Sequence, residues 1–218
     1  MKQNSDSLAD TPDTVERLKK LHEKLRACRL CKTVQGRAVH GPAFRTPVML
    51  VGQAPGVHEE TLGRPFAYTA GKTLFKWLGD ATGASEEELR EMIYFSAVAR
   101  CFPGKSTSGK GDRTPSALEV SNCSQHLREE INAVRPKIIL AVGRVAILEV
   151  LATMSIKKTT PLEQLVGRKI RSRFHGHEVD VIPLPHPSGV SSWPHTEPGK
   201  SRLKAALELI RSEVAPLF

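Results

Sequence analysis

Four cysteines are the residues of this 218-residue chain whose spacing most clearly suggests chemistry. Cys28 and Cys31 form a C-x-x-C pair, whereas Cys101 and Cys123 come from two later segments. Four thiolates from separate segments can hold a tetrahedral metal ion or a cubane iron–sulfur cluster. The set therefore predicts a metal centre, and it requires these segments to meet in the folded chain.

Two other interpretations of the cysteines stay open. Free cysteine is commonly a buried residue, so the four thiols could be unrelated. Zinc is the chemical rival of a 4Fe–4S cluster, but zinc sites usually use two close pairs. Here only the first pair is close, because 21 residues separate Cys101 from Cys123. This spacing favours a cluster and leaves zinc as the alternative.

Two short loops carry further candidate residues. Residues 52–56 (GQAPG) directly follow an apolar run, and their glycines and proline suit a rigid turn whose backbone approaches a ligand closely. A tight turn without a ligand explains the same pattern. Residues 186–193 (HPSGVSSW) follow a later apolar run, and their histidine could donate a hydrogen bond to a developing anion. Their small residues suit close approach to a phosphate backbone, and Trp193 is either a wedge into a base stack or a core residue.

The elements that position these loops follow from the apolar pattern. Short Val/Ile/Leu runs that alternate with helical periodicity predict a parallel α/β sheet. The expected strands are 47–51, 93–98 and 137–142, with a hairpin of 169–174 and 177–182. The expected helices are 12–25, 71–82, a short one from Ser85, 115–134, 144–151 and 200–214. The carboxyl ends of parallel strands share one edge, so the two loops can face each other there.

The segment 102–114 (FPGKSTSGKGDRT) is a basic, glycine-rich loop. We interpret it as a flexible basic arm, which either contacts DNA or is only solvated.

The charge of the chain suggests its partner. The formal net charge is +9, and such a surplus favours a polyanion, nucleic acid first, over a basic protein without such a partner. No apolar run approaches ~18 residues and no signal peptide is evident, so we expect a cytoplasmic protein with no membrane contact. We expect residues 1–10 to be disordered and 11–218 to form one domain.

The motifs, taken together and in order, resemble the uracil-DNA glycosylase superfamily, in particular its iron–sulfur, family-4-like branch. The resemblance covers about residues 25–212. The matching pieces are C-x-x-C at 28–31, G-Q-A-P-G at 52–56, Gly63-Arg64-Pro65-Phe66 with Ala70-Gly71, Cys101, Arg113-x-Pro115 with Glu119 and Cys123, and H-P-S at 186–188.

The resemblance implies a three-layer α/β sandwich with a central four-stranded parallel sheet flanked by helices. It implies a structural 4Fe–4S cluster held by the four cysteines. It also implies hydrolysis of an N-glycosidic bond on a base flipped out of DNA, in base excision repair. We expect a monomer that binds single- or double-stranded DNA.

The resemblance also implies roles for single residues. His186 would stabilise the leaving base anion, and Gln53 and Glu59 would orient the attacking water. The implied base-pocket residues are Gly52, Ala54, Pro55, Gly56, Phe66 and Ala97. The implied DNA contacts are Lys72, Lys110, Arg113, Ser188, Gly189, Ser191 and Trp193.

Three positions depart from the family pattern. Gln53 stands where the family-4 enzymes have a carboxylate, and a neutral amide can orient water but cannot act as a base. Ala97 stands where the family has a base-reading asparagine, and the 102–114 loop is long.

From the resemblance we expect a DNA glycosylase acting on a deaminated or otherwise modified base. The alternatives are a protein that binds a lesion or abasic site without turnover, and a redox-active DNA-binding iron–sulfur protein.

Overall fold

The structure is a computed structural model that describes residues 12–109, 111–154, 156–174 and 176–218. The predictions of a disordered segment at residues 1–10 and of a DNA contact at Lys110 lie outside the described residues.

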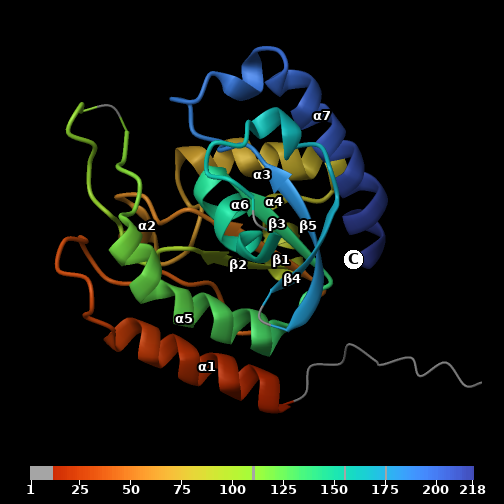
Figure 1. Cartoon of the computed structure of the whole chain (residues 1–218). Helices are drawn as coiled ribbons and strands as arrows, with labels where there is room; N and C mark the ends of the chain where they lie inside the picture. Colours follow the sequence, from red (N-terminus) through yellow and green to blue (C-terminus); the bar gives the residue numbers. More distant parts are fainter. Residues whose placement is uncertain (1–11, 110, 155, 175) are drawn as a thin grey trace, which may run out of the picture.

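A five-stranded sheet forms the centre of the fold, in the order β2-β1-β3-β5-β4 (Figure 1). The strands are β1 (Val48–Gly52), β2 (Ile93–Ala97), β3 (Ile138–Val142), β4 (Ile170–Phe174) and β5 (His177–Leu184). β2, β1, β3 and β5 are parallel, and β4 pairs antiparallel with β5 at the edge. The expected four-stranded parallel sheet is confirmed, and the predicted hairpin adds a fifth, antiparallel strand to it.

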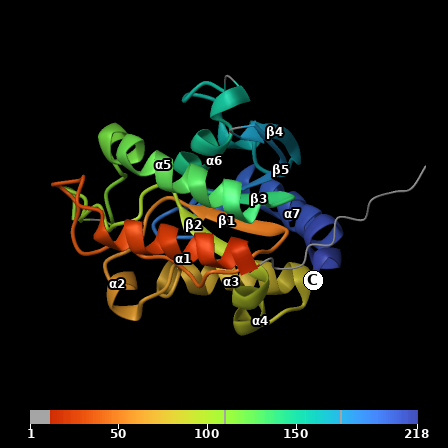
Figure 2. The same ribbon diagram turned by 90° about the horizontal axis from the view of Figure 1, so that it is seen from below.

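Helices cover both faces of the sheet. They are α1 (Pro12–Ala27), α2 (Glu59–Leu62), α3 (Thr69–Thr82), α4 (Glu86–Met92), α5 (Ala117–Val134), α6 (Arg144–Val150) and α7 (Gly199–Leu209). In Figure 1, α3, α4 and α7 lie above the sheet, while α5 lies below it with α1 outside. Figure 2 shows α1 running along α5, and the two helices are in contact. None of the helices described here is long and apolar enough to span a membrane.

The sequence pattern explains the sheet. All five residues of β1, β2 and β3 are buried, as expected for parallel strands covered by helices on both faces. β4 is different, because exposed Arg171 and Arg173 alternate with buried side chains. This alternation identifies a strand with one face in solvent, which is the pattern of a sheet edge.

Capping residues decide two helix boundaries. Ser85 and Glu88 form the predicted capping box at the start of α4. A second capping box, between Ser116 and Glu119, starts α5 at Ala117, so the predicted start at Pro115 is two residues early. The one-turn helix α2 was not predicted, because four residues carry too little periodicity.

The strand order places a crevice at the carboxyl edge of the sheet. The chain leaves β1 towards β2, on one side, and later adds β3 on the other side of β1. The loops that follow β1 and β3 therefore diverge, and the crevice between them is where open α/β sheets bind ligands.

A buried polar network joins β2 to the helices below the sheet. Arg100 and Glu130 are both 1% exposed and form a direct ion pair. Ser96 donates to Glu130 at 2.9 Å, and His22 of α1 lies 2.8 Å from the Tyr94 hydroxyl and 3.8 Å from Glu130. Burial, followed by the neighbouring His40, lowers the pKa of His22 to about 4, so this histidine is neutral near pH 7.

Breaking the buried pair should be costly. In Glu130→Gln the Arg100 charge loses its counter-ion in a dry environment, and we expect a loss of about 3–5 kcal/mol in the free energy of unfolding. Urea denaturation measures the difference. The control is Glu208→Gln, which removes an exposed pair with Arg211 and should change stability by less than about 1 kcal/mol. Equal effects in both variants would contradict the prediction.

Candidate active site

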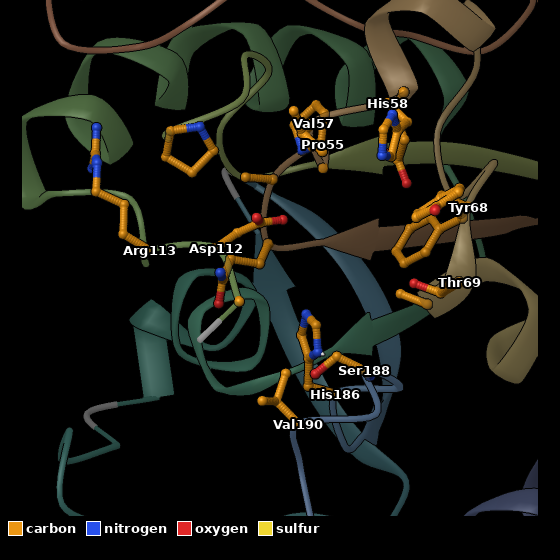
Figure 3. A pocket seen from close by; sticks show the side chains of 18 of the residues that line it. Pro55, Val57, His58, Tyr68, Thr69, Asp112, Arg113, His186, Ser188 and Val190 are labelled. Carbon is orange, nitrogen blue, oxygen red and sulfur yellow. Dashed lines mark hydrogen bonds between the residues drawn. The ribbon is translucent and has the colours of Figure 1, made fainter. Parts of the chain in front are cut away.

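A cavity of about 460 Å³ opens at the carboxyl edge of the sheet (Figure 3). Five segments line it: the loop after β1 with α2, the segment from Phe66 to the start of α3, the 102–114 loop, the end of β3, and the loop after β5. The lining residues are Gln53, Ala54, Pro55, Gly56, Val57, His58, Glu59, Phe66, Tyr68, Thr69, Ala70, Pro103, Lys105, Gly111, Asp112, Arg113, Val142, His186, Ser188, Gly189 and Val190. The two loops that the sequence singled out therefore meet in one cavity, as expected.

His186 is held in a defined protonation state. The backbone N–H of Ser188 donates to its Nδ1 at 3.2 Å, so the neutral ring carries its proton on Nε2. Burial lowers the pKa of His186, and the carboxylate of Asp112 opposes that shift. The ring packs closely on Gly143, where an added Cβ would lie 3.0 Å from Cδ2 of His186. The side chain can therefore donate one hydrogen bond from Nε2 without carrying a charge.

The turn after β1 is fixed by hydrogen bonds that continue the strand pairing. Val98 N–H donates to Gly52 O at 2.9 Å, and Ala99 N–H donates to Gln53 O at 3.0 Å. The Gln53 side chain lines the cavity with Ala54, Pro55 and Gly56, as predicted. Hydrogen bonds to the segment after β2 hold the backbone of this turn. The Gln53 side chain therefore extends from a backbone of defined position at the cavity wall.

Phe66 is held in a backbone conformation that is uncommon outside glycine, with φ of 53°. Arg90 donates to the carbonyl oxygens of Pro65 and Phe66, each at 3.0 Å. The Phe66 ring lies against Gly52, where an added Cβ would be 2.6 Å from Cζ. Gly52, a predicted pocket residue, is thus not among the lining residues; it leaves room for the ring that is.

Glu59 lines the cavity but is 7% exposed. Burial raises its pKa to about 7, while backbone hydrogen bonds from Phe66, Gly56 and Ala67 and the charge of Arg90 oppose the shift. The carboxyl group therefore joins the turn after β1 to the segment that carries Phe66.

The described residues of the 102–114 loop form a hairpin, which its interpretation as a flexible arm did not include. It is the light-green loop projecting at the left of Figure 1. Lys105 and Asp112 form an antiparallel bridge, Arg113 N–H donates to Gly104 O at 3.0 Å, and Ser106 N–H donates to Gly111 O at 3.1 Å. The sequence interpretation missed the hairpin and with it Asp112 as a lining residue. Opposite charges at hairpin spacing, with glycines near the tip, were the available signal.

Arg113, a predicted DNA contact, makes a bidentate ion pair with buried Glu119 at 2.8 and 2.6 Å. This pair is the main cause that lowers the pKa of Glu119 to about 2. In Figure 3 the Arg113 side chain points away from His186 and Asp112. Thr33 also donates to Glu119, at 2.7 Å, so the guanidinium takes part in holding three segments together.

The other predicted site residues divide by place. Ser188 and Gly189 line the cavity, whereas Ala97, buried at the end of β2, and Lys72, exposed on α3, do not. Ser191 and Trp193 also lie outside the lining. Trp193 is half-buried against the hydrophobic core and close to Gly199. Its predicted role as a wedge into DNA stays a prediction.

Backbone and side-chain hydrogen bonds connect the segments that carry the cysteines. Gln35 N–H donates to Phe102 O and Val39 N–H to Arg100 O, both at 2.8 Å, which brings the segment after Cys31 alongside Cys101. Asn122 of α5 donates to Cys31 Sγ at 3.4 Å.

The thiols influence one another electrostatically. Burial, then Cys123, Cys28 and Cys31, raise the pKa of Cys101 to about 12. Over the described residues, no group of three or more His, Cys, Asp or Glu side chains is arranged to hold a metal ion directly. The donor set nevertheless fits a thiolate-ligated centre in kind, because a cationic centre would offset the mutual repulsion of four thiolates.

Glu59 should make stability depend on pH. Its pKa rises from the ordinary 4.5 to about 7 on folding, so ionisation is harder in the folded chain. The native state therefore loses stability as pH rises from about 4.5 through about 7. We expect the free energy of unfolding of Glu59→Gln, measured by thermal unfolding, to match that of the wild type below pH 4.5. Above about pH 7 it should exceed the wild-type value by up to about 3 kcal/mol. Exposed Glu91→Gln is the control, and a pH-independent difference for Glu59→Gln would contradict the prediction.

The chain is similar to several named glycosylases over most of its length. It is 29% identical to the Type-4 uracil-DNA glycosylase of Sulfurisphaera tokodaii over 177 residues, covering 80% of this chain and 76% of the relative. It is 28% identical to the Type-4 enzyme of Archaeoglobus fulgidus over 208 residues, covering 94% and 98%. It is 32% identical to the Type-5 uracil-DNA glycosylase of Pyrobaculum aerophilum, covering 62% of each. The family model of the uracil DNA glycosylase superfamily matches residues 38–210, and the chain belongs to that superfamily.

Proposed function

We propose that this protein is a DNA glycosylase that hydrolyses the N-glycosidic bond of uracil or another deaminated base in DNA, within base excision repair. The observation that carries the proposal is His186, a neutral histidine with its proton on Nε2 at the wall of a 460 Å³ cavity. A cavity of this size takes small ligands. The relatives named as uracil-DNA glycosylases support the same activity.

The reaction follows from the groups at the cavity. The bond between C1′ and the base nitrogen breaks, and its electron pair leaves with the base. Nε2–H of His186 donates a hydrogen bond to the oxygen on which that charge develops, which lowers the barrier most when the donor is already in place. A water molecule then adds to C1′ and loses a proton. Phe66, half-buried beside Gly52, provides a ring on which the flipped base stacks.

The base preference stays broad in this proposal. Ala97 has no side-chain amide, is buried and is not among the lining residues, so it cannot read the edge of uracil. We therefore include hypoxanthine and xanthine beside uracil as candidate bases. A second function, binding of a lesion or abasic site without turnover, is favoured by one observation: Gln53 lines the cavity and carries no charge.

The four cysteines, in our proposal, hold a 4Fe–4S cluster, with zinc as the alternative. When bound, the cluster cross-links the three cysteine-bearing segments and takes no part in bond cleavage. Cys28, Cys31, Cys101 and Cys123 are all free thiols, which fits a reducing compartment such as the cytoplasm. The net charge of +9 supports DNA as the partner of a monomeric enzyme, with binding that weakens as salt rises.

Removing the histidine should separate catalysis from binding. We expect His186→Ala to lower the single-turnover rate of uracil release by about 10²- to 10³-fold, the usual cost of losing one such donor. Affinity for an oligonucleotide with an abasic-site analogue should change little. His195→Ala, an exposed histidine outside the cavity lining, is the control.

Two outcomes of this experiment are informative. Equal losses of rate and affinity in His186→Ala would argue against a role in the transition state. If the wild type releases no base from DNA and still binds the lesion tightly, the binding function replaces the glycosylase function.

The metal centre has its own test. The protein purified without oxygen should be brown and contain four iron atoms per chain, since a cubane cluster holds four. Cys101→Ser should lower the iron content and the visible absorption. A colourless protein with one zinc per chain would instead establish the alternative.

A further inference from the structure

The proposed reaction needs a negative charge that Gln53 does not supply. An oxocarbenium-like sugar is positively charged, and the water that attacks it must lose a proton. Two carboxyl groups, those of Glu59 and Asp112, are among the residues that line the cavity. Which of these carboxyl groups can act on the sugar and the water depends on the hydrogen bonds and ion pairs that it already makes.

Glu59 is poorly suited to the task. It is buried, its pKa is raised to about 7, and backbone hydrogen bonds from Phe66, Gly56 and Ala67 converge on it. The carboxyl group accepts these hydrogen bonds and so holds the backbone of the cavity wall in place. The raised pKa also leaves the carboxyl group incompletely ionised at neutral pH.

Asp112 is engaged on one side and open on the other. Its Oδ1 accepts from Lys105 Nζ at 2.8 Å, and its side chain is 34% exposed. Its Oδ2 lies 3.5 Å from the position that a Cβ on Gly56 would occupy. In Figure 3, Asp112 lies between Pro55 and His186, and its charge acts on the His186 ring. One carboxylate oxygen therefore faces the turn that carries Gln53.

The hairpin holds Asp112 in this place. The bridge to Lys105 and the hydrogen bond from Arg113 N–H to Gly104 O flank it on the backbone. Next to it, Gly111 has φ of 75°, and an added Cβ there would lie 3.4 Å from Cγ2 of Val190, another lining residue. The ion pair of Arg113 with Glu119 anchors the base of the hairpin.

We propose that Asp112 is the catalytic carboxylate of this protein, in the glycosylase reaction proposed above, and that it replaces the acid absent at Gln53. As the C1′–N bond breaks and its electron pair leaves with the base, the Asp112 carboxylate faces the positive sugar. A water molecule held by Gln53 adds its oxygen to C1′, and its proton passes to Asp112 and then to solvent. The products are the free base, protonated from solvent, and an abasic sugar with a C1′ hydroxyl.

The experiment compares Asp112→Asn with the wild type in single-turnover release of uracil from a single-stranded oligonucleotide. Asparagine keeps the size of the side chain and removes the charge. We expect a rate about 10²-fold lower, as for the loss of a positioned base, and an unchanged affinity for the abasic-site analogue. Asp80→Asn is the matched control, because Asp80 makes a comparable exposed pair with Lys76 at 2.8 Å outside the cavity lining.

Two further variants separate catalysis from hairpin structure. Lys105→Gln removes the same ion pair and keeps the carboxylate, so its rate should fall much less than that of Asp112→Asn. Adding Gln53→Glu to Asp112→Asn should restore at least about tenfold in rate, because it returns an acid to the cavity.

The outcomes distinguish the two proposals. Release of uracil by the wild type and by Asp112→Asn at equal rates overturns the role of Asp112 and leaves the glycosylase function intact. A loss in Lys105→Gln as large as that in Asp112→Asn also overturns it, in favour of a structural role. A wild type that releases uracil, hypoxanthine and xanthine from no oligonucleotide overturns both proposals.

Discussion

The buried ion pair between Arg100 and Glu130 joins the segment after β2 to α5, and the rest of the structure depends on this contact. Arg100 follows β2 and directly precedes Cys101, while Glu130 lies in α5, two turns beyond Cys123. Two charges removed from water are stable only when they meet, so the segment after β2 must lie against the C-terminal part of α5. The same contact leaves Nε and Nη1 of Arg100 buried without a protein partner in the structure. The segments that carry Cys101 and Cys123 are thereby joined by a polar contact that is independent of any metal.

A second polar contact connects the cysteine region with the active site. Glu119 accepts hydrogen bonds from Thr33, in the segment after Cys31, and from Arg113, at the base of the hairpin. Arg113 directly follows Asp112. The contacts of Glu119 therefore join the segment after Cys31, which belongs to the proposed metal-binding segments, to the hairpin that lines the cavity. If Asp112 is the catalytic carboxylate, as we propose, these contacts help to hold it in place, and catalytic groups must be held closely.

The cavity is built by glycines as much as by functional side chains. Gly52 leaves room for the Phe66 ring and Gly143 for the His186 ring, and both lie where β1 and β3 end. Each side chain is therefore pressed against backbone, which restricts its motion without a further hydrogen bond. This arrangement explains why His186 needs only the Ser188 amide to fix its tautomer.

The sequence by itself determined the parallel sheet, the helices, the meeting of the Gly52 and His186 loops, and the family. These are local properties: buried strands are continuous apolar runs, capping boxes lie within four residues, and parallel strands end at one edge. Only the tertiary structure decided the roles of particular side chains. Arg113 was predicted to contact DNA, and only the structure shows that it also pairs with buried Glu119. Gly52 was expected in the cavity wall and instead lies behind Phe66. Asp112 entered the site because a hairpin closes over the cavity, and pairing between residues of a polar, glycine-rich loop leaves almost no periodic signal in the sequence.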